Sequence, residues 1–296
     1  YWTTTRVINS TPAVSDTTNI SLIALRMRAS KQLSGMIDNF SVEATSKLYR
    51  YDSGWGWATT QNPAWVYYDI VTGDANYAAV DSTRVDTDTI KEWATFCDTE
   101  GYEFNAVIDS EITVFELLKA VCATGQASFN FLDTEYSVIY DDTQNSVKQL
   151  ITPRNSWDLQ GTRNTLSMPH GFKVGFVNDE NGWKQDERIV YDDGYDATGT
   201  GDNDAATDIV ALNWLGVTQP DQVYKLARYQ LACLRLRPET FTVNMDWEHL
   251  AINRGDLVRV NYDTIKWGLG VARVREAGKL AGVYVIDIDD EFTMSS

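Results

Sequence analysis

The hydrophobic periodicity of this chain changes along its length, and that change limits the folds it can adopt. Polar and apolar residues alternate within the first 60 residues, for example over 21–27 and 36–42. A period of two is typical of half-buried β-strands. Helical spacing then dominates to about residue 125, and strand patterns return from Trp157 onward. This order predicts an α+β fold that is mainly β.

Two short helices are predicted by the signals at their ends. The run 62–73 places Asn at the N-cap, Pro at the first helical position and Gly just after the last turn. The next helix is expected to begin near Asp88 or Thr89, because Thr89 and Glu92 can form a capping box, and to end before Gly101.

A third helix is predicted from about Asp109 to Gly125, with Thr113 and Glu116 as its capping box. A hairpin should follow, because the aromatic and β-branched runs 127–132 and 136–141 flank a polar turn. These elements together predict a compact α+β unit.

One more helix is predicted among the later strands, over about 219–237. Val223, Leu226, Ala227, Leu231 and Leu234 fall on one face of it. The basic side chains near its end are expected to complement the negative C-terminal end of the helix dipole. They are Arg228, Arg235 and Arg237.

The predicted elements divide the chain into three regions. Residues 1–60 form a β segment that we expect to contribute to a barrel, and 61–155 form the α+β domain. Residues 156–296 form a β-barrel-like domain with the helix over 219–237, because a closed or nearly closed barrel accounts for its many strands. Since the chain begins without Met, we also expect it to be part of a longer polypeptide.

The balance of charges excludes some partners. The chain has 25 Lys and Arg against 42 Asp and Glu, which gives a formal net charge of −17. Nucleic-acid binding needs clustered basic residues, so a binding groove for DNA or RNA is not expected. An acidic wall would instead let DNA pass through a pore without sticking. No apolar run approaches the ~20 residues of a membrane helix, so membrane insertion is not expected either.

Few residues suit catalysis or metal binding. His170 and His249 are the only histidines, and neither has a metal ligand at a suitable spacing. Cys97, Cys122 and Cys233 are an odd number far apart, which favours reduced thiols in a reducing cytoplasm. We therefore expect no catalytic residue, no cofactor and no enzymatic activity.

An acidic loop over 192–208 is the weak candidate for a calcium site. Its candidate ligands are Asp192, Asp196, Asp202 and Asp204. The loop lacks the ligand spacing and the terminal Glu of an EF-hand, so a solvated surface loop is the favoured interpretation.

The aromatic content leaves one alternative function open. Ten tryptophans among many acids would also suit a carbohydrate-binding or glycoside-hydrolase module, in which aromatic rings stack on sugars and two carboxylates cleave the bond. Trp65 and Trp93 fall on predicted helices, where core packing explains them. Trp2, Trp55 and Trp57 are harder to assign.

Six segments together carry a family resemblance in their order and spacing. They are 22–44, 62–73, 90–122, the Pro-Arg-Asn triplet 153–155, 182–194 and 227–260. In these segments the chain resembles the central region of phage tail tip attachment proteins, the host-specificity protein J family of lambda-like siphophages and related prophage tails. One departure is the short stretch 74–80, where the family often has an Arg-Tyr-Gly element.

The resemblance implies a structural protein rather than an enzyme. It implies a central hub or baseplate protein at the virion tail tip, made in the host bacterial cytoplasm, with tail-tube-like β-barrel domains and an α+β side domain. The implied partners are two further copies in a homotrimer and other tail tip and tail tube proteins, while DNA passes without specific binding. The hub would join the tail tube to the receptor-binding parts and serve viral genome ejection.

Overall fold

The computed structural model describes residues 42–163, 168–262, 274–280 and 283–288. The chain divides into two compact units, Tyr1–Ala44 and Thr45–Ser296, and all the helices and strands below belong to the second unit. The strands expected over 21–27 and 36–42 lie outside the described residues, except for Val42. The expected domain limits near residues 60 and 155 remain predictions.

The second unit begins with a hairpin and a helix. Strands β1 (Lys47–Tyr51) and β2 (Trp55–Thr59) pair antiparallel, and helix α1 (Pro63–Thr72) follows with Asn62 as its N-cap, as predicted. The Asn62 side chain accepts a hydrogen bond from the Ala64 backbone N–H at 2.9 Å. Its Nδ2 also donates to the Ala94 carbonyl at 2.8 Å, so the same cap ties α1 to the next helix.

Helix α2 (Thr87–Glu100) begins slightly earlier than predicted, after the short 3-10 helix η1 (Ser82–Arg84). Its N-cap is Asp86 and not Thr89, because the Asp86 carboxylate accepts a hydrogen bond from the Thr89 backbone N–H at 3.1 Å. The prediction of a capping box at Thr89 was therefore wrong. Gly101 ends the helix with a φ of 73°, in the left-handed region that Gly occupies readily.

Helix α3 (Val114–Thr124) has the predicted capping box of Thr113 and Glu116, and it begins at that box rather than near Asp109. Strands β3 (Ala127–Leu132) and β4 (Glu135–Tyr140) form the predicted hairpin. Its two turn residues, Asp133 and Thr134, have φ angles of 50° and 72°, as a tight two-residue turn requires.

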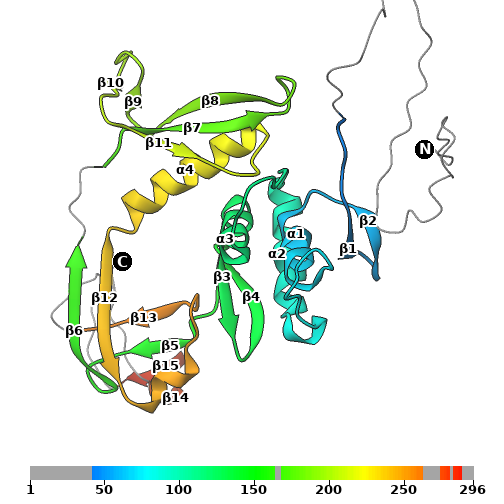
Figure 1. Ribbon diagram of the computed structural model, residues 1–296. Helices are drawn as coiled ribbons and strands as arrows, with labels where there is room; N and C mark the ends of the chain where they lie inside the picture. Colours follow the sequence, from blue (N-terminus) through cyan, green and yellow to red (C-terminus); the bar gives the residue numbers. More distant parts are fainter. Residues whose placement is uncertain (1–41, 164–167, 263–273, 281–282, 289–296) are drawn as a thin grey trace, which may run out of the picture. The chain divides into compact units, whose positions relative to one another are not determined.

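A three-stranded sheet carries the last helix. Strands β7 (Gly171–Asn178) and β8 (Lys184–Tyr191) are antiparallel, and β11 (Ile209–Asn213) pairs parallel with β7. Helix α4 (Pro220–Leu236) lies along this sheet (Figure 1). Four of the five residues predicted to share one face are buried, whereas Leu234 is 44% exposed.

The remaining strands form small open sheets. They are β6 (Ser156–Arg163) with β12 (Glu239–Met245), β5 (Gln149–Ile151) with β13 (Val258–Val260), β9 (Tyr195–Asp196) with β10 (Asp204–Ala205), and β14 (Val274–Leu280) with β15 (Val283–Ile288). The 3-10 helix η2 (Trp247–Ala251) follows β12. The fold is α+β and mainly β, as predicted, but the described strands do not close into a barrel.

One cluster of buried residues runs through β1, helices α1 to α4, β4, β7 and β8. It includes Leu48 on β1, Trp93 on α2, Val174 on β7 and Leu231 on α4. Because this core joins residues from all three predicted regions, the α+β elements and the α4 sheet support each other.

Candidate functional site

The part of the chain built from β5, β6, β12, β13 and η2 buries little of its own surface. Over 142–163 and 237–262 the described residues include only two buried side chains, Ile151 and Ser156. Large apolar side chains are instead exposed, among them Trp157 at 55%, Trp247 at 79% and Leu250 at 67%. An isolated two-stranded sheet is marginally stable in water, and exposed apolar patches often mark interaction surfaces.

The longer sheet of this part, β6 with β12, carries little of the usual protection of edge strands in its described residues. Natural edges carry Lys, Pro or inward-pointing charges that prevent pairing with another chain. Between them, β6 and β12 contain only Asp158, Arg163 and Glu239 as charged residues, and Arg163 lies 3.9 Å from Glu239. The irregular pairing between Thr242 and Asn244 interrupts the ladder once. Low charge on these strands, together with the exposed Trp157 of β6, marks a surface suited to a protein contact.

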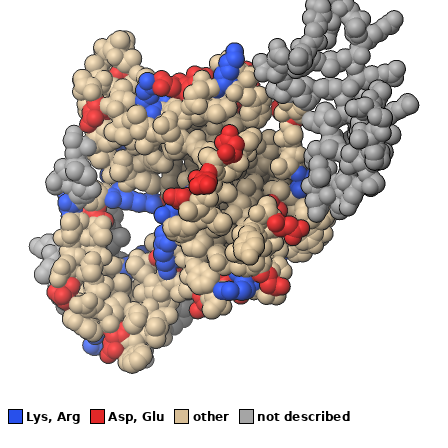
Figure 2. Space-filling view, in the orientation of Figure 1, with Lys and Arg blue, Asp and Glu red and all other residues tan. Residues whose placement is uncertain are grey.

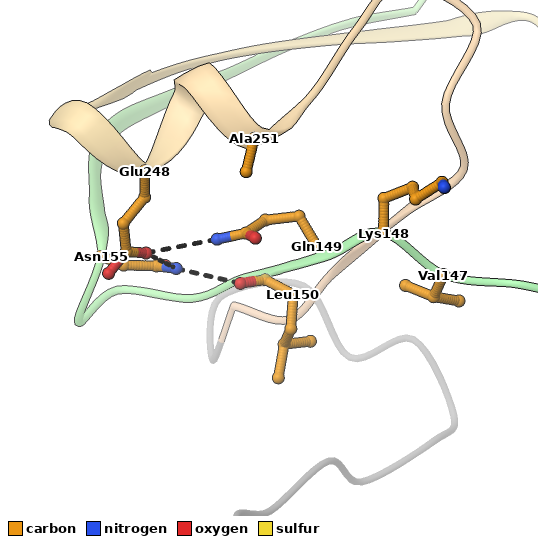
Figure 3. A pocket seen from close by; sticks show the side chains of 7 residues that line it. All are labelled: Val147, Lys148, Gln149, Leu150, Asn155, Glu248 and Ala251. Carbon is orange, nitrogen blue, oxygen red and sulfur yellow. Dashed lines mark hydrogen bonds between the residues drawn. The ribbon is translucent and has the colours of Figure 1, made fainter.

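A shallow pocket of about 520 Å³ opens beside η2 (Figure 3). Its lining residues are Val147, Lys148, Gln149, Leu150, Asn155, Glu248 and Ala251. The side chains of Glu248 and Ala251 on η2 point towards β5, which forms the opposite wall.

Hydrogen bonds hold one side of this pocket in place. Glu248 Oε2 accepts from Asn155 Nδ2 at 2.8 Å and from Gln149 Nε2 at 3.3 Å. Asn155 Nδ2 also donates to the Leu150 carbonyl at 3.0 Å, and Asn155 Oδ1 accepts from the Thr152 backbone N–H at 2.8 Å. Asn155 is the last residue of the Pro-Arg-Asn triplet, so the triplet helps to join β5 to η2.

The first calcium candidate is engaged in ion pairs. The Asp192 side chain is 9% exposed and lies 3.2 Å from Arg235 and 3.6 Å from Arg228. The adjacent Asp193 contacts the same two guanidinium groups, and its bonds to Arg235 and Arg228 hold its pKa below the usual value. These arginines therefore tie α4 to the end of β8. Arg235 lies in the last turn of α4, and its predicted interaction with the helix dipole stays a prediction.

The third arginine of the predicted set has a different partner. Arg237 lies 2.7 Å from Asp141, which also accepts a hydrogen bond from the Tyr229 hydroxyl at 2.7 Å. Asp141 follows β4, so these contacts connect the C-terminal end of α4, where Arg237 is the C-cap, with the β3–β4 hairpin.

The other calcium candidates do not converge. Asp196 accepts hydrogen bonds from the backbone N–H groups of Thr198 and Thr200, at 2.8 and 2.9 Å, and these bonds lower its pKa. Asp204 lies on β10, paired with β9, and Asp202 is an exposed turn residue. In the part of the chain that the structure describes, no three His, Cys, Asp or Glu side chains gather in a way that could hold a metal ion.

The tryptophans take several different positions. Trp65 and Trp93 are buried at 2% and 0% exposure, as their helical positions predicted. Trp55 stacks on Tyr49 with ring centroids 5.4 Å apart and planes 13° apart, so each ring covers the other's face. Such packing does not leave the open ring face that stacking on a sugar requires. Trp57 is 62% exposed, and Trp2 lies outside the described residues.

All three cysteines are free, and Cys97 and Cys122 are buried. Burial raises the pKa of the Cys122 thiol to about 12, and burial is also the main cause of the raised pKa of Cys97. Thiols protonated at neutral pH are poor nucleophiles, so both residues serve packing.

The surface charge is mixed on the face shown in Figure 2, where acidic and basic side chains are interspersed and most of the surface carries neither. The acidic lining expected for a pore therefore remains a prediction. Among the described residues, no helix is both long enough and apolar enough to cross a membrane.

Comparisons with known proteins find similar chains among the solved structures. No protein-family model matches the chain, and no curated protein matches it. The chain is similar to a structure described as the tail protein from Neisseria meningitidis MC58, with 14% identity and a TM-score of 0.41. The match covers 58% of this chain and 52% of that chain, about half its length. A similarity at this level does not establish a shared fold.

Proposed function

We propose that this chain is a structural component of a phage or prophage tail tip, a central hub protein that assembles as a trimer. The proposal rests on the exposure of the part formed by β5, β6, β12, β13 and η2. Among its described residues, only Ile151 and Ser156 are buried. Strands with exposed apolar side chains and low charge gain stability when a neighbouring subunit covers them.

The family resemblance is the reason for placing this assembly at a phage tail tip. The resembling segments include 153–155 and 227–260, and both contribute to the exposed part. In the proposed hub, copies of these strands complete the barrel that a single chain leaves open. The hub then continues the tail tube and holds the receptor-binding parts.

The role proposed for the acidic residues is passive. With a net charge of −17, a hub whose lumen is lined by carboxylates repels the DNA backbone and lets it slide through. No bond is made or broken in this role, so it needs neither a catalytic residue nor a cofactor.

Immunogold electron microscopy of purified tails tests the location. Antibodies against this chain should label one end of each tail, at the tip. Labelling along the whole tube, or at the head-proximal end, would contradict a tip hub.

A further inference from the structure

The turn of the β7–β8 hairpin holds a tryptophan in an unusual backbone conformation. Gly182 and Trp183 both have positive φ angles, 68° and 60°. Gly adopts this left-handed region freely, but a bulky side chain rarely does. Trp183 is 42% exposed, and among the described residues it is not one of those packed against the core. Strain at an exposed residue that the core does not use points to a function.

The turn is ordered by its own hydrogen bonds. The Trp183 backbone N–H donates to the Asn178 carbonyl at 2.9 Å, and the Glu180 N–H donates to Asn178 Oδ1 at 3.0 Å. Asn178 Nδ2 donates in turn to Asp186 at 2.8 Å. The backbone that carries Trp183 is therefore held in place, which lowers the entropy lost when the turn binds. Residues 179–183 are called the Trp183 turn below.

The pocket beside η2 offers matching chemistry. Ala251 supplies an apolar side chain that faces β5 (Figure 3), and the pocket of about 520 Å³ is large enough for an indole ring. Glu248 accepts two hydrogen bonds, both through Oε2. Among the described residues, none donates to its Oε1. A buried indole N–H needs an acceptor of this kind.

The charges around the two features are also complementary. The Trp183 turn contains Asp179 and the exposed Glu180, whereas the pocket lining includes Lys148. Among the described lining residues, the charged ones are Lys148 and Glu248, and the Glu248 carboxylate receives two amide hydrogen bonds. An acidic turn therefore meets a basic group when the two surfaces approach each other.

We propose that Trp183 of one copy inserts into the η2 pocket of the next copy, an inference that rests on the proposed assembly. The indole N–H donates to Glu248, and Lys148 faces Asp179 and Glu180. Because the turn and the pocket are different surfaces, the contact is head-to-tail, and such contacts form a closed ring when the rotation between copies closes.

Two variants of the full chain test this contact. Trp183→Asn removes the indole at a position where Asn tolerates the left-handed backbone, and Ala251→Trp fills the pocket. Each variant alone should lose assembly, with association weakened by about 30-fold or more, as for a central anchor residue. An equimolar mixture has one intact turn and one intact pocket, so native mass spectrometry should find a heterodimer that does not grow further.

Trp57→Asn is the matched control, since it removes another exposed tryptophan and should leave the assembly intact. Normal assembly of Trp183→Asn overturns the contact but leaves the proposed hub function standing. Mixtures that remain monomeric overturn the contact as well. If Trp183→Asn loses thermal stability as well as assembly, Trp183 serves folding and the contact is overturned. If the unaltered chain never assembles, both proposals are contradicted.

Discussion

Gln222 on α4 donates a hydrogen bond from Nε2 to the backbone carbonyl of Thr124, 3.1 Å away at the end of α3. The Gln222 side chain is almost fully buried, at 2% exposure. It also donates to the Glu103 carbonyl at 2.9 Å and accepts from the Glu103 backbone N–H at 3.3 Å. One amide therefore joins α4 to two backbone segments of the α+β elements.

Replacing Gln222 with Met keeps the length of the side chain but removes all of these hydrogen bonds. We expect the free energy of unfolding to fall by about 2 to 4 kcal/mol, because buried backbone groups lose their partners. Urea denaturation followed by tryptophan fluorescence measures the change. The control is Gln185→Met on the exposed part of β8, which should change the stability by less than about 0.5 kcal/mol.

Gly216 should be far less tolerant of Ala than Gly101. Both have positive φ angles, 84° and 73°, but a Cβ at Gly216 would lie 2.3 Å from the Phe104 ring, and one at Gly101 would meet nothing within 4 Å. We expect Gly101→Ala to cost about 1 kcal/mol and Gly216→Ala about 3 kcal/mol or more. Equal losses in thermal unfolding would show that the Phe104 contact has no effect.

Asp86 should make the stability of the protein depend on pH in the acid range. Burial acts to raise the Asp86 pKa, but hydrogen bonds from Thr89 and Ser137 outweigh it and lower the pKa below its usual value. Its contribution is therefore complete above the unfolded-state pKa of about 3.9 and is lost as the pH falls through the lower folded-state pKa. Asp86→Asn should flatten this part of the profile, and an unchanged profile contradicts the assignment.

The thiols should differ in reactivity. Cys97 and Cys122 are buried with raised pKa values, whereas Cys233 is partly exposed. In the folded chain, a thiol reagent at neutral pH should modify Cys233 first and leave the other two intact until unfolding. Peptide mass spectrometry over a time course identifies the order, and early modification of Cys122 would contradict the buried core around it.

Local signals in the sequence were sufficient for much of the fold. The N-cap at Asn62, the capping box at Thr113 and the β3–β4 turn act within a few residues, and the structure confirms each of them. The error at Thr89 arose because both Asp86 and Thr89 can cap a helix. Asp86 is the cap in the structure, and its carboxylate also accepts a bond from the distant Ser137.

The features of the candidate site depend on tertiary contacts that periodicity does not contain. The helical spacing of Leu234 gave no sign that it faces solvent, and the partners of Arg228 and Arg235 lie more than thirty residues away in sequence. The strain at Trp183 was also not predicted, although Gly182 before it was a local turn signal. In the proposed hub, closure of the strands into a barrel depends on neighbouring copies, which the sequence of one chain does not contain.

The mass of the intact protein in solution tests the central claim most directly. Native mass spectrometry over a range of concentrations, supported by light scattering, should find three times the chain mass of 33.3 kDa. A single chain mass at every concentration would contradict the account, because the exposed strands β6 and β12 would then be stable without a neighbouring copy.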